Sequence, residues 1–107
     1  MKRWEVDYTS EAKKDRELLE KTVRIQVDKA IFKVSQNPLP KSEGGYGDPL
    51  GNKQGRNLTG LLKIKLKKLG VRVVYILIRD KEIMRVLVIA ARADSEVYDI
   101  AGSRGDI

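Results

Sequence analysis

The chain has 107 residues, which suffice for one compact domain, so a single domain over residues 1–107 is expected. It contains neither cysteine nor histidine. Disulfides and thiolate chemistry are thereby excluded, together with the commonest general base and metal ligand of proteins. No apolar run reaches the roughly 18 residues of a membrane span, and the opening MKRWEVDYTS lacks the apolar segment of a signal peptide. We expect a cytoplasmic protein without a membrane partner.

The formal net charge is +7, and it is unevenly distributed. Residues 1–50 carry ten basic and nine acidic side chains, whereas residues 51–107 carry twelve basic and six acidic ones. No acidic residue lies between Asp48 and Asp80, a stretch with eight basic residues. A stretch of one sign within an apolar pattern indicates a polyanionic partner, with nucleic acid as the first candidate and an acidic protein as the second.

The first third of the chain predicts one strand and a helical hairpin. Residues 3–8, RWEVDY, alternate apolar and charged side chains as a strand does, and Thr9 and Ser10 are both candidate helix N-caps. Apolar residues then recur at helical spacing as far as Gln36. Because Thr22 can cap a second helix, we predict a break near residues 20–22.

Residues 38–60 contain all three prolines and six of the nine glycines, and predict a long loop. Three strand-like runs follow, at residues 61–67, 71–78 and 83–91, and predict an antiparallel meander. Ser95 can cap a short C-terminal helix before a frayed tail, GSRGDI. The predicted fold class is α+β: an N-terminal strand, a helical hairpin, the antiparallel β-meander and a short C-terminal helix.

Three lysines, Lys63, Lys65 and Lys67, alternate with apolar residues in the first strand of the meander. A two- or four-residue reversal before Val71 would pair Lys65 with Arg72, whereas an odd reversal would turn Arg72 toward the core. Burying an arginine is costly, so we predict the even reversal and a cation cluster of Lys63, Lys65, Lys67 and Arg72 on one sheet face. Neighbouring cations disfavour the charged form of a lysine. Lys65 is therefore a candidate general base, and Arg72 can bind a phosphate through two hydrogen bonds.

Two segments, KIKLKKLGVRVVY at residues 63–75 and VLVIAARADSEVYDIA at residues 86–101, resemble the RelE family of toxin–antitoxin ribonucleases. The opening WEVDYTSEAKKDRELL and the loop with NPLP, DPLGNK and LTG are similar to the wider RelE/ParE superfamily. The resemblance therefore spans nearly the whole chain and implies a RelE/ParE-like fold.

This resemblance implies a metal-independent, ribosome-dependent endoribonuclease without a cofactor, which cleaves mRNA in the A site by attack of the ribose 2′-OH. The matching catalytic positions are Lys63, Lys65, Arg72, Arg92 and Tyr98. Lys63 and Arg72 would hold the scissile phosphate and stabilise its growing charge, and Tyr98 would orient the nucleotide. Arg92 would either stabilise the pentavalent intermediate or assist the leaving oxygen. Lys65 and Tyr98 both remain candidates for the proton acceptor. Tyr75 is interpreted as a packing residue.

Four further cations of the same basic region are assigned to RNA binding: Lys53, Arg56, Lys67 and Lys68. The expected partners are the ribosome with its rRNA and mRNA, and a cognate antitoxin. DNA would be reached only indirectly, through an antitoxin that represses its own operon.

Regular alternation places apolar residues on both sheet faces. It assigns to the Arg72 face Val74, Ile76, Leu87 and Ile89, and to the other face Val73, Tyr75, Leu77, Val86 and Val88. The helical hairpin can cover only one face, so the second needs the C-terminal helix or a partner. An acidic, amphipathic antitoxin helix would suit this apolar patch and the positive charge.

Two alternatives remain. One is a ParE-like inhibitor of DNA gyrase on the same fold, which would not need the lysine, arginine and tyrosine set. The other is a non-catalytic module that binds RNA or the ribosome.

Overall fold

The fold is taken from a computed structural model, which describes residues 3–53, 56–91 and 94–105, without the side chains of residues 52, 53, 56–58, 94–96, 98 and 105. In chain order the elements are β1 (Glu5–Tyr8), α1 (Ser10–Glu17), α2 (Lys21–Ser35), the 3-10 turn η1 (Lys41–Glu43), β2 (Asp48–Lys53), β3 (Arg56–Leu66), β4 (Val71–Ile78), the 3-10 turn η2 (Arg79–Lys81), β5 (Ile83–Ala90) and α3 (Asp94–Gly105).

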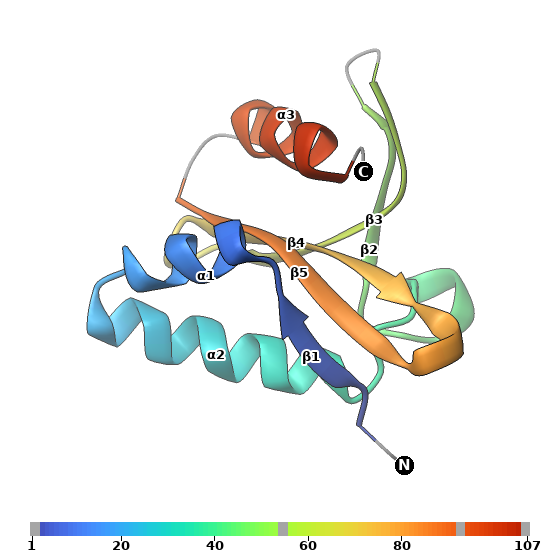
Figure 1. The fold of residues 1–107 in the computed structure, drawn as a ribbon, viewed down its shortest axis with the longest axis horizontal. Coiled ribbons are helices and arrows are strands. Elements are labelled where there is room, and N and C mark those ends of the chain that lie inside the picture. Colours follow the sequence, from blue (N-terminus) through green and yellow to red (C-terminus); the bar gives the residue numbers. More distant parts are fainter. Residues whose placement is uncertain (1–2, 54–55, 92–93, 106–107) are drawn as a thin grey trace.

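A five-stranded sheet in the order β1-β5-β4-β3-β2 forms the centre of the molecule (Figure 1). β1 runs parallel to β5, and the other neighbouring pairs are antiparallel. The predicted α+β class and the meander of the last three strands are confirmed. β1 lies next to β5, so the first and the last strand of the chain are neighbours in the sheet.

The long loop predicted for residues 38–60 is wrong in its second half. β2 occupies Asp48–Lys53, and β3 begins at Arg56 rather than at residue 61. A register shift between Pro49 and Gly51, with Gly51 at φ 59°, interrupts the pairing of β2 with β3. The sequence pattern did not predict this strand, because it contains proline and glycine, which are uncommon inside regular strands. Both residues are tolerated at a sheet edge or a bulge, which is where they lie here.

The helical hairpin is confirmed, with a change in its second cap. The Thr9 hydroxyl accepts a hydrogen bond from the Ala12 amide at 3.1 Å, as an N-cap does. α2 begins at Lys21 after Glu20, which makes no side-chain cap, so the cap predicted at Thr22 is wrong. Instead, the Arg24 guanidinium donates to the carbonyls of residues 16, 17 and 19 at the end of α1. This arginine therefore binds the end of α1, where helix carbonyls lack the amide partners of a continuing helix.

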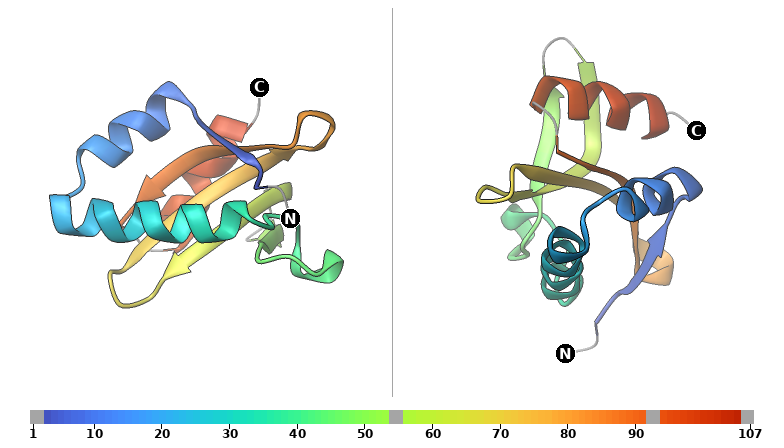
Figure 2. Two further views of the ribbon diagram at one scale, coloured as in Figure 1. Left: turned by 90° about the horizontal axis from the view of Figure 1, so that it is seen from below. Right: turned by 90° about the vertical axis from the view of Figure 1, so that its left-hand side faces the viewer.

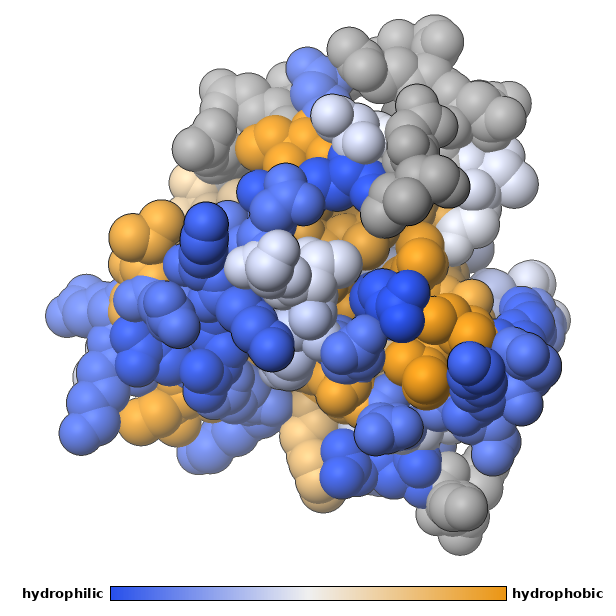
Figure 3. Space-filling model, in the orientation of Figure 1, coloured by the Kyte–Doolittle hydropathy of each residue, from blue (hydrophilic) through white to orange (hydrophobic). Residues whose placement is uncertain are grey.

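α1 and α2 lie on one side of the sheet and α3 on the other, as the right-hand view of Figure 2 shows, and an apolar core lies on each face. The first lies under α1 and α2 and contains Ala12, Val27, Ile31, Val34, Leu62, Val71, Val73, Tyr75, Met84, Val86 and Ile89. The second lies under α3 and contains Leu50, Leu61, Val74, Leu87, Val88, Val97 and Ala101. Hydrophilic residues dominate the outer surface over α2 at the lower left of Figure 3, as expected for an amphipathic helix.

A bulge in β5 changes the predicted faces of two residues. Val74 pairs with Val88, but Tyr75 pairs with Val86, which leaves Leu87 as the extra residue. As a result Val88 joins Leu87 in the α3 core, and Ile89 lies in the core of the helical hairpin. The prediction of Ile89 on the Arg72 face and Val88 on the other was wrong, because it assumed unbroken alternation.

α3 covers the second apolar face. Val97 and Ala101 are fully buried against β3, β4 and β5. The helix continues to Gly105, so residues 102–105 are helical, and the prediction that they belong to a frayed tail is wrong. Of the two lids predicted for this face, the C-terminal helix is the one observed. Over the described ranges, no helix is long and apolar enough to cross a membrane.

Tyr75 connects the sheet to the loop after α2. Its side chain is fully buried, as predicted for a packing residue, and its hydroxyl donates to the Pro38 carbonyl at 2.8 Å. A Cβ at Gly47 would lie 2.5 Å from this hydroxyl, so only glycine fits there. Burial, and secondarily the Asp48 carboxylate, raise the pKa of Tyr75 above its usual value of 10.0.

We expect Tyr75→Phe to lower the free energy of unfolding by about 1 to 3 kcal/mol at neutral pH, because the Pro38 carbonyl loses its partner. The raised pKa stabilises the folded state fully below pH 10.0, and this contribution is lost as the pH rises further. Urea unfolding between neutral pH and pH 11 should therefore show a shallower alkaline loss of stability in Tyr75→Phe than in the wild type. Equal alkaline slopes would contradict this assignment.

Candidate active site

The β3–β4 hairpin brings the predicted cations together. Lys65 pairs with Arg72, and Lys63 pairs with Val74. The connection is the four-residue turn 67–70, closed by a hydrogen bond from the Leu69 amide to the Leu66 carbonyl at 3.2 Å. Gly70 has φ 66°, a conformation that glycine adopts without strain. The even reversal and the pairing of Lys65 with Arg72 are confirmed.

Three of the four predicted cations, Lys63, Lys65 and Arg72, lie on the face that α3 covers, and they are called the cation cluster from here on. Lys67 was predicted to share this face but follows the end of β3 and lies in the turn. Val74, which shares this face, packs in the α3 core, whereas Ile64 packs against the core of the helical hairpin. Directly opposed residues have Cβ atoms about 5 Å apart, so Lys65 and Arg72 are neighbours. Lys65 is exposed, while Lys63 and Arg72 are partly buried.

Arg72 is held near the turn. One of its guanidinium nitrogens donates to the Gly70 carbonyl at 3.4 Å. Its pairing partner on the other side is Ala90, at the end of β5. The cluster therefore lies where β3 ends, β4 begins and β5 ends (Figure 1).

The two remaining predicted catalytic residues belong to the segment that follows β5. Arg92 lies outside the described residues and comes two positions after Ala90, the partner of Arg72. The backbone of Tyr98 belongs to α3, next to the buried Val97, and its side chain is not described. The helix that carries Tyr98 thus packs over the same sheet face as the cluster.

The predicted RNA-binding residues are divided between two places. Lys67 and Lys68 are exposed in the β3–β4 turn beside the cluster. Lys53 and Arg56 pair at the opposite end of β3, at the tip of the β2–β3 ribbon, and their side chains are not described. Lys53 and Arg56 therefore do not form one continuous basic surface with Lys67 and Lys68 along the turn.

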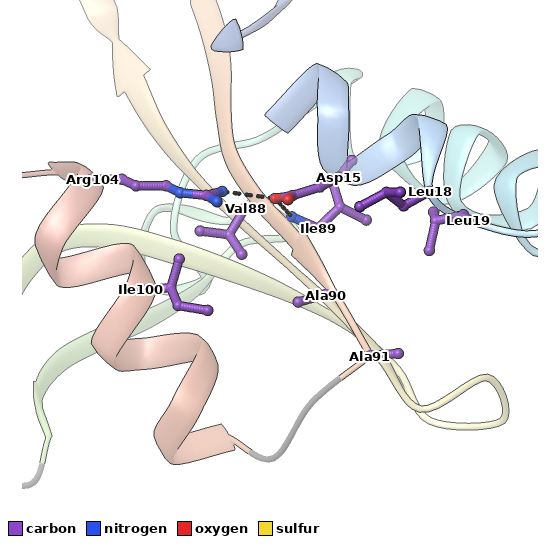
Figure 4. A pocket seen from close by; sticks show the side chains of 9 residues that line it. All are labelled: Asp15, Leu18, Leu19, Val88, Ile89, Ala90, Ala91, Ile100 and Arg104. Carbon is purple, nitrogen blue, oxygen red and sulfur yellow. Dashed lines mark hydrogen bonds and ion pairs between the residues drawn. The ribbon is translucent and has the colours of Figure 1, made fainter. Parts of the chain in front are cut away.

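Sequence reasoning missed an ion pair that holds α3 in place. The Arg104 guanidinium lies 2.7 Å from Asp15 of α1 and donates to the Leu87 carbonyl at 2.8 Å. The same Asp15 oxygen accepts from the Ile89 amide at 3.1 Å (Figure 4). Both side chains are largely buried, at 18% and 19% exposure. The pairing of β1 with β5 ends at Val86, so the Leu87 carbonyl and the Ile89 amide find their hydrogen-bond partners in this ion pair. The pair therefore joins α1, β5 and α3.

No local signal pointed to this pair. Asp15 lies in a run of charged residues on α1, and Arg104 lies in the segment predicted to fray. The pair borders a pocket of about 270 Å³ between α1 and α3, whose floor is the end of β5 (Figure 4). In the described part of the chain, no three carboxylates lie close enough together to hold a metal ion.

Comparisons with known proteins identify the relatives of this chain. No family model matches the sequence. The mRNA interferase toxin RelE of Escherichia coli strain K12 is 32% identical over 99 residues, which are 92% of this chain and 94% of that protein. A RelE-like toxin protein of Escherichia coli is 29% identical over 103 residues, with coverage of 95% and 97%.

Solved structures agree with these relatives. The crystal structure of the isolated E. coli RelE toxin matches with a TM-score of 0.68 at 29% identity, over 94% of this chain and 97% of that chain. An E. coli RelE mutant in complex with a RelBc antitoxin peptide matches with a TM-score of 0.70 at 29% identity, over 94% and 95%. The fold is therefore that of RelE-like toxins.

With a relative above 30% identity that is matched over nearly its whole length, the chain belongs to the RelE family.

We expect Arg104→Ala to lower the free energy of unfolding by about 2 to 4 kcal/mol, because it leaves the largely buried Asp15 carboxylate without its cation. Urea denaturation measures the loss. Arg79→Ala is the matched control, since it removes an exposed pair with Glu43 and should have a much smaller effect. Equal losses in the two variants would contradict the role of Arg104 as the clamp on α3.

Proposed function

We propose that this protein is the toxin of a type II toxin–antitoxin system and an endoribonuclease that cleaves mRNA in the ribosomal A site. The observation that supports this most strongly is the pairing of Lys65 with Arg72 on the sheet face covered by α3. A general base and a phosphate ligand are then within reach of one RNA linkage. The named activity of the E. coli relative agrees with this chemistry.

The proposed reaction is an internal transfer of the phosphodiester. The ribose 2′-oxygen forms a bond to the adjacent phosphorus while the bond from phosphorus to the 5′-oxygen breaks. The products are a 2′,3′-cyclic phosphate and a 5′-hydroxyl. One proton must leave the 2′-hydroxyl, and water can supply the proton that the leaving oxygen takes up.

The residues have separate roles in this proposal. Lys65 or Tyr98 accepts the 2′-hydroxyl proton. Lys63 and Arg72 bind the non-bridging phosphate oxygens, whose negative charge grows in the transition state. Arg92 stabilises the charge on the leaving oxygen, and Tyr98 orients the nucleotide. None of these steps needs an imidazole.

An antitoxin is the proposed protein partner, as RelB is for E. coli RelE. α3 rests on an apolar face built by Leu61, Val74 and Leu87. An acidic, amphipathic antitoxin helix that displaced α3 would cover this face and remove Tyr98 from the site. Arg104→Ala should then tighten antitoxin binding, because the loosened α3 is easier to displace. Unchanged affinity in that variant would contradict displacement.

Mapping of mRNA 5′ ends during translation in vitro tests the activity. The wild type should produce new 5′-hydroxyl ends within A-site codons. Lys65→Ala should slow cleavage by about 10² to 10⁴-fold, the range for loss of a general base. Lys81→Ala is the matched control, because it removes the same charge from an exposed site at the other end of the β4–β5 hairpin.

A supercoiling assay with DNA gyrase tests the first alternative, a gyrase inhibitor. Inhibition of gyrase without any mRNA cleavage would reject the ribonuclease. If the wild type bound the ribosome and arrested translation without producing new mRNA 5′ ends, and Lys65→Ala weakened that binding only modestly, a non-catalytic binding module would replace the ribonuclease.

A further inference from the structure

A groove runs along the open part of the β3 edge. The pairing of β2 with β3 ends at Asp48 and Lys63, so residues 64–66 of β3 pair with β4 alone. α2 passes beneath this edge (Figure 2), and the loop that leads into β2 closes the end of the groove. The volume of this open groove is about 460 Å³.

The lining of this groove is strongly basic. It contains five lysines and one carboxylate, Asp48. Lys33 comes from α2, Lys41 from the following loop, and Lys63, Lys65 and Lys67 from β3. Asp48 lies 3.1 Å from Lys41 and opposes Lys63 in the pairing of β2 with β3, so lysines outnumber carboxylates five to one in this lining. A concave surface of one sign attracts a polyanion.

Tyr46 adds an aromatic ring to this basic lining. Its side chain remains 49% exposed, and the Lys33 ammonium lies 5.6 Å from the ring centroid. Exposed aromatic rings beside cations are how proteins hold single-stranded nucleic acid, since a base stacks on the ring while the phosphates meet the cations.

The backbone around Tyr46 is held rigidly. The Tyr46 amide donates to the Asn37 carbonyl at 3.0 Å, and the Gly47 amide donates to the Leu39 carbonyl at 2.9 Å. A Cβ at Gly45 would lie 2.0 Å from the Leu39 carbonyl oxygen, so a side chain there would displace the loop. Two closely packed glycines thus flank one exposed tyrosine, which gives a preorganised platform.

We propose that this groove binds the RNA strand next to the cleaved linkage, with Tyr46 stacking on a base and Lys33 and Lys67 contacting phosphates. Lys65 connects the two sites, because it lines the groove and pairs with Arg72. The strand would cross the open β3 edge from the α3 face to the α2 face. The inference rests on the proposed function and adds a path for the flanking nucleotides.

Binding of a short single-stranded RNA with 2′-O-methyl riboses tests this groove without cleavage, because the attacking hydroxyl is blocked. Tyr46→Ala should weaken binding by about 5- to 150-fold, the value of one stacked base. Tyr46→Phe should bind almost as the wild type does. Phe32→Ala is the matched control, since Phe32 is a similarly exposed ring on α2 outside the groove.

The salt dependence tests the cation. Lys33→Ala should reduce the slope of log affinity against log salt by about 0.7, the value for one phosphate of a single strand. Lys29→Ala removes the same charge from an exposed position of α2 outside the groove and should leave the slope nearly unchanged.

Three results would overturn the groove: no RNA binding by the wild type, equal affinities for Tyr46→Ala and Phe32→Ala, or equal slopes for Lys33→Ala and Lys29→Ala. The second result is also expected if an acidic antitoxin strand, rather than RNA, occupies the open edge. Mapping of 5′ ends separates the two proposals. If the protein cleaves mRNA but Tyr46→Ala binds RNA as well as the control does, only the groove is rejected. If RNA binding depends on Tyr46 but no mRNA is cleaved, only the ribonuclease is rejected.

Discussion

The distance between Lys65 and Arg72 depends on the length of one turn. Four residues connect β3 and β4, so Arg72 faces the same way as Lys65. Side chains alternate along a strand, and a slip of one residue would turn Arg72 toward the core of the helical hairpin. Gly70, at φ 66°, allows the turn to close without strain. The candidate active site, its link to α3 and the groove at the β3 edge all depend on this register.

The sheet has a different cover on each face, and the second cover carries part of the site. α1 and α2 pack on one core, whereas α3 packs on the other. The bulge at Leu87 turns both Leu87 and Val88 toward α3, which gives this helix an apolar floor. Arg104 and Asp15 then fasten α3 to the backbone of β5. Because the ion pair holds α3 at one end only, α3 can be stably packed and still be displaced by the helix of a protein partner.

Local patterns predicted the features that local physics determines. Residue type narrowed the first helix cap to Thr9 or Ser10, of which the structure uses Thr9. The pairing of Lys65 with Arg72 followed from parity and the cost of burying an arginine. β2 was missed because its strand contains a proline and a glycine at positive φ.

Long-range contacts were beyond such patterns. The bulge at Leu87, the parallel pairing of β1 with β5 and the contact of Arg104 with Asp15 join residues far apart in the sequence. Tyr46 stood between glycines in GGYG. Only the packing of Gly45 and Gly47 explains why that loop is rigid.

A double-mutant cycle on cleavage rates tests most directly whether the paired cations act as one catalytic unit. The four proteins are the wild type, Lys65→Ala, Arg72→Ala and the variant with both changes. If base and phosphate ligand act on the same linkage, the double variant should be within about threefold of the slower single variant, as residues that work as a unit are not additive. A double variant slowed by the full product of the two single effects would show that Lys65 and Arg72 act independently, and would contradict the account.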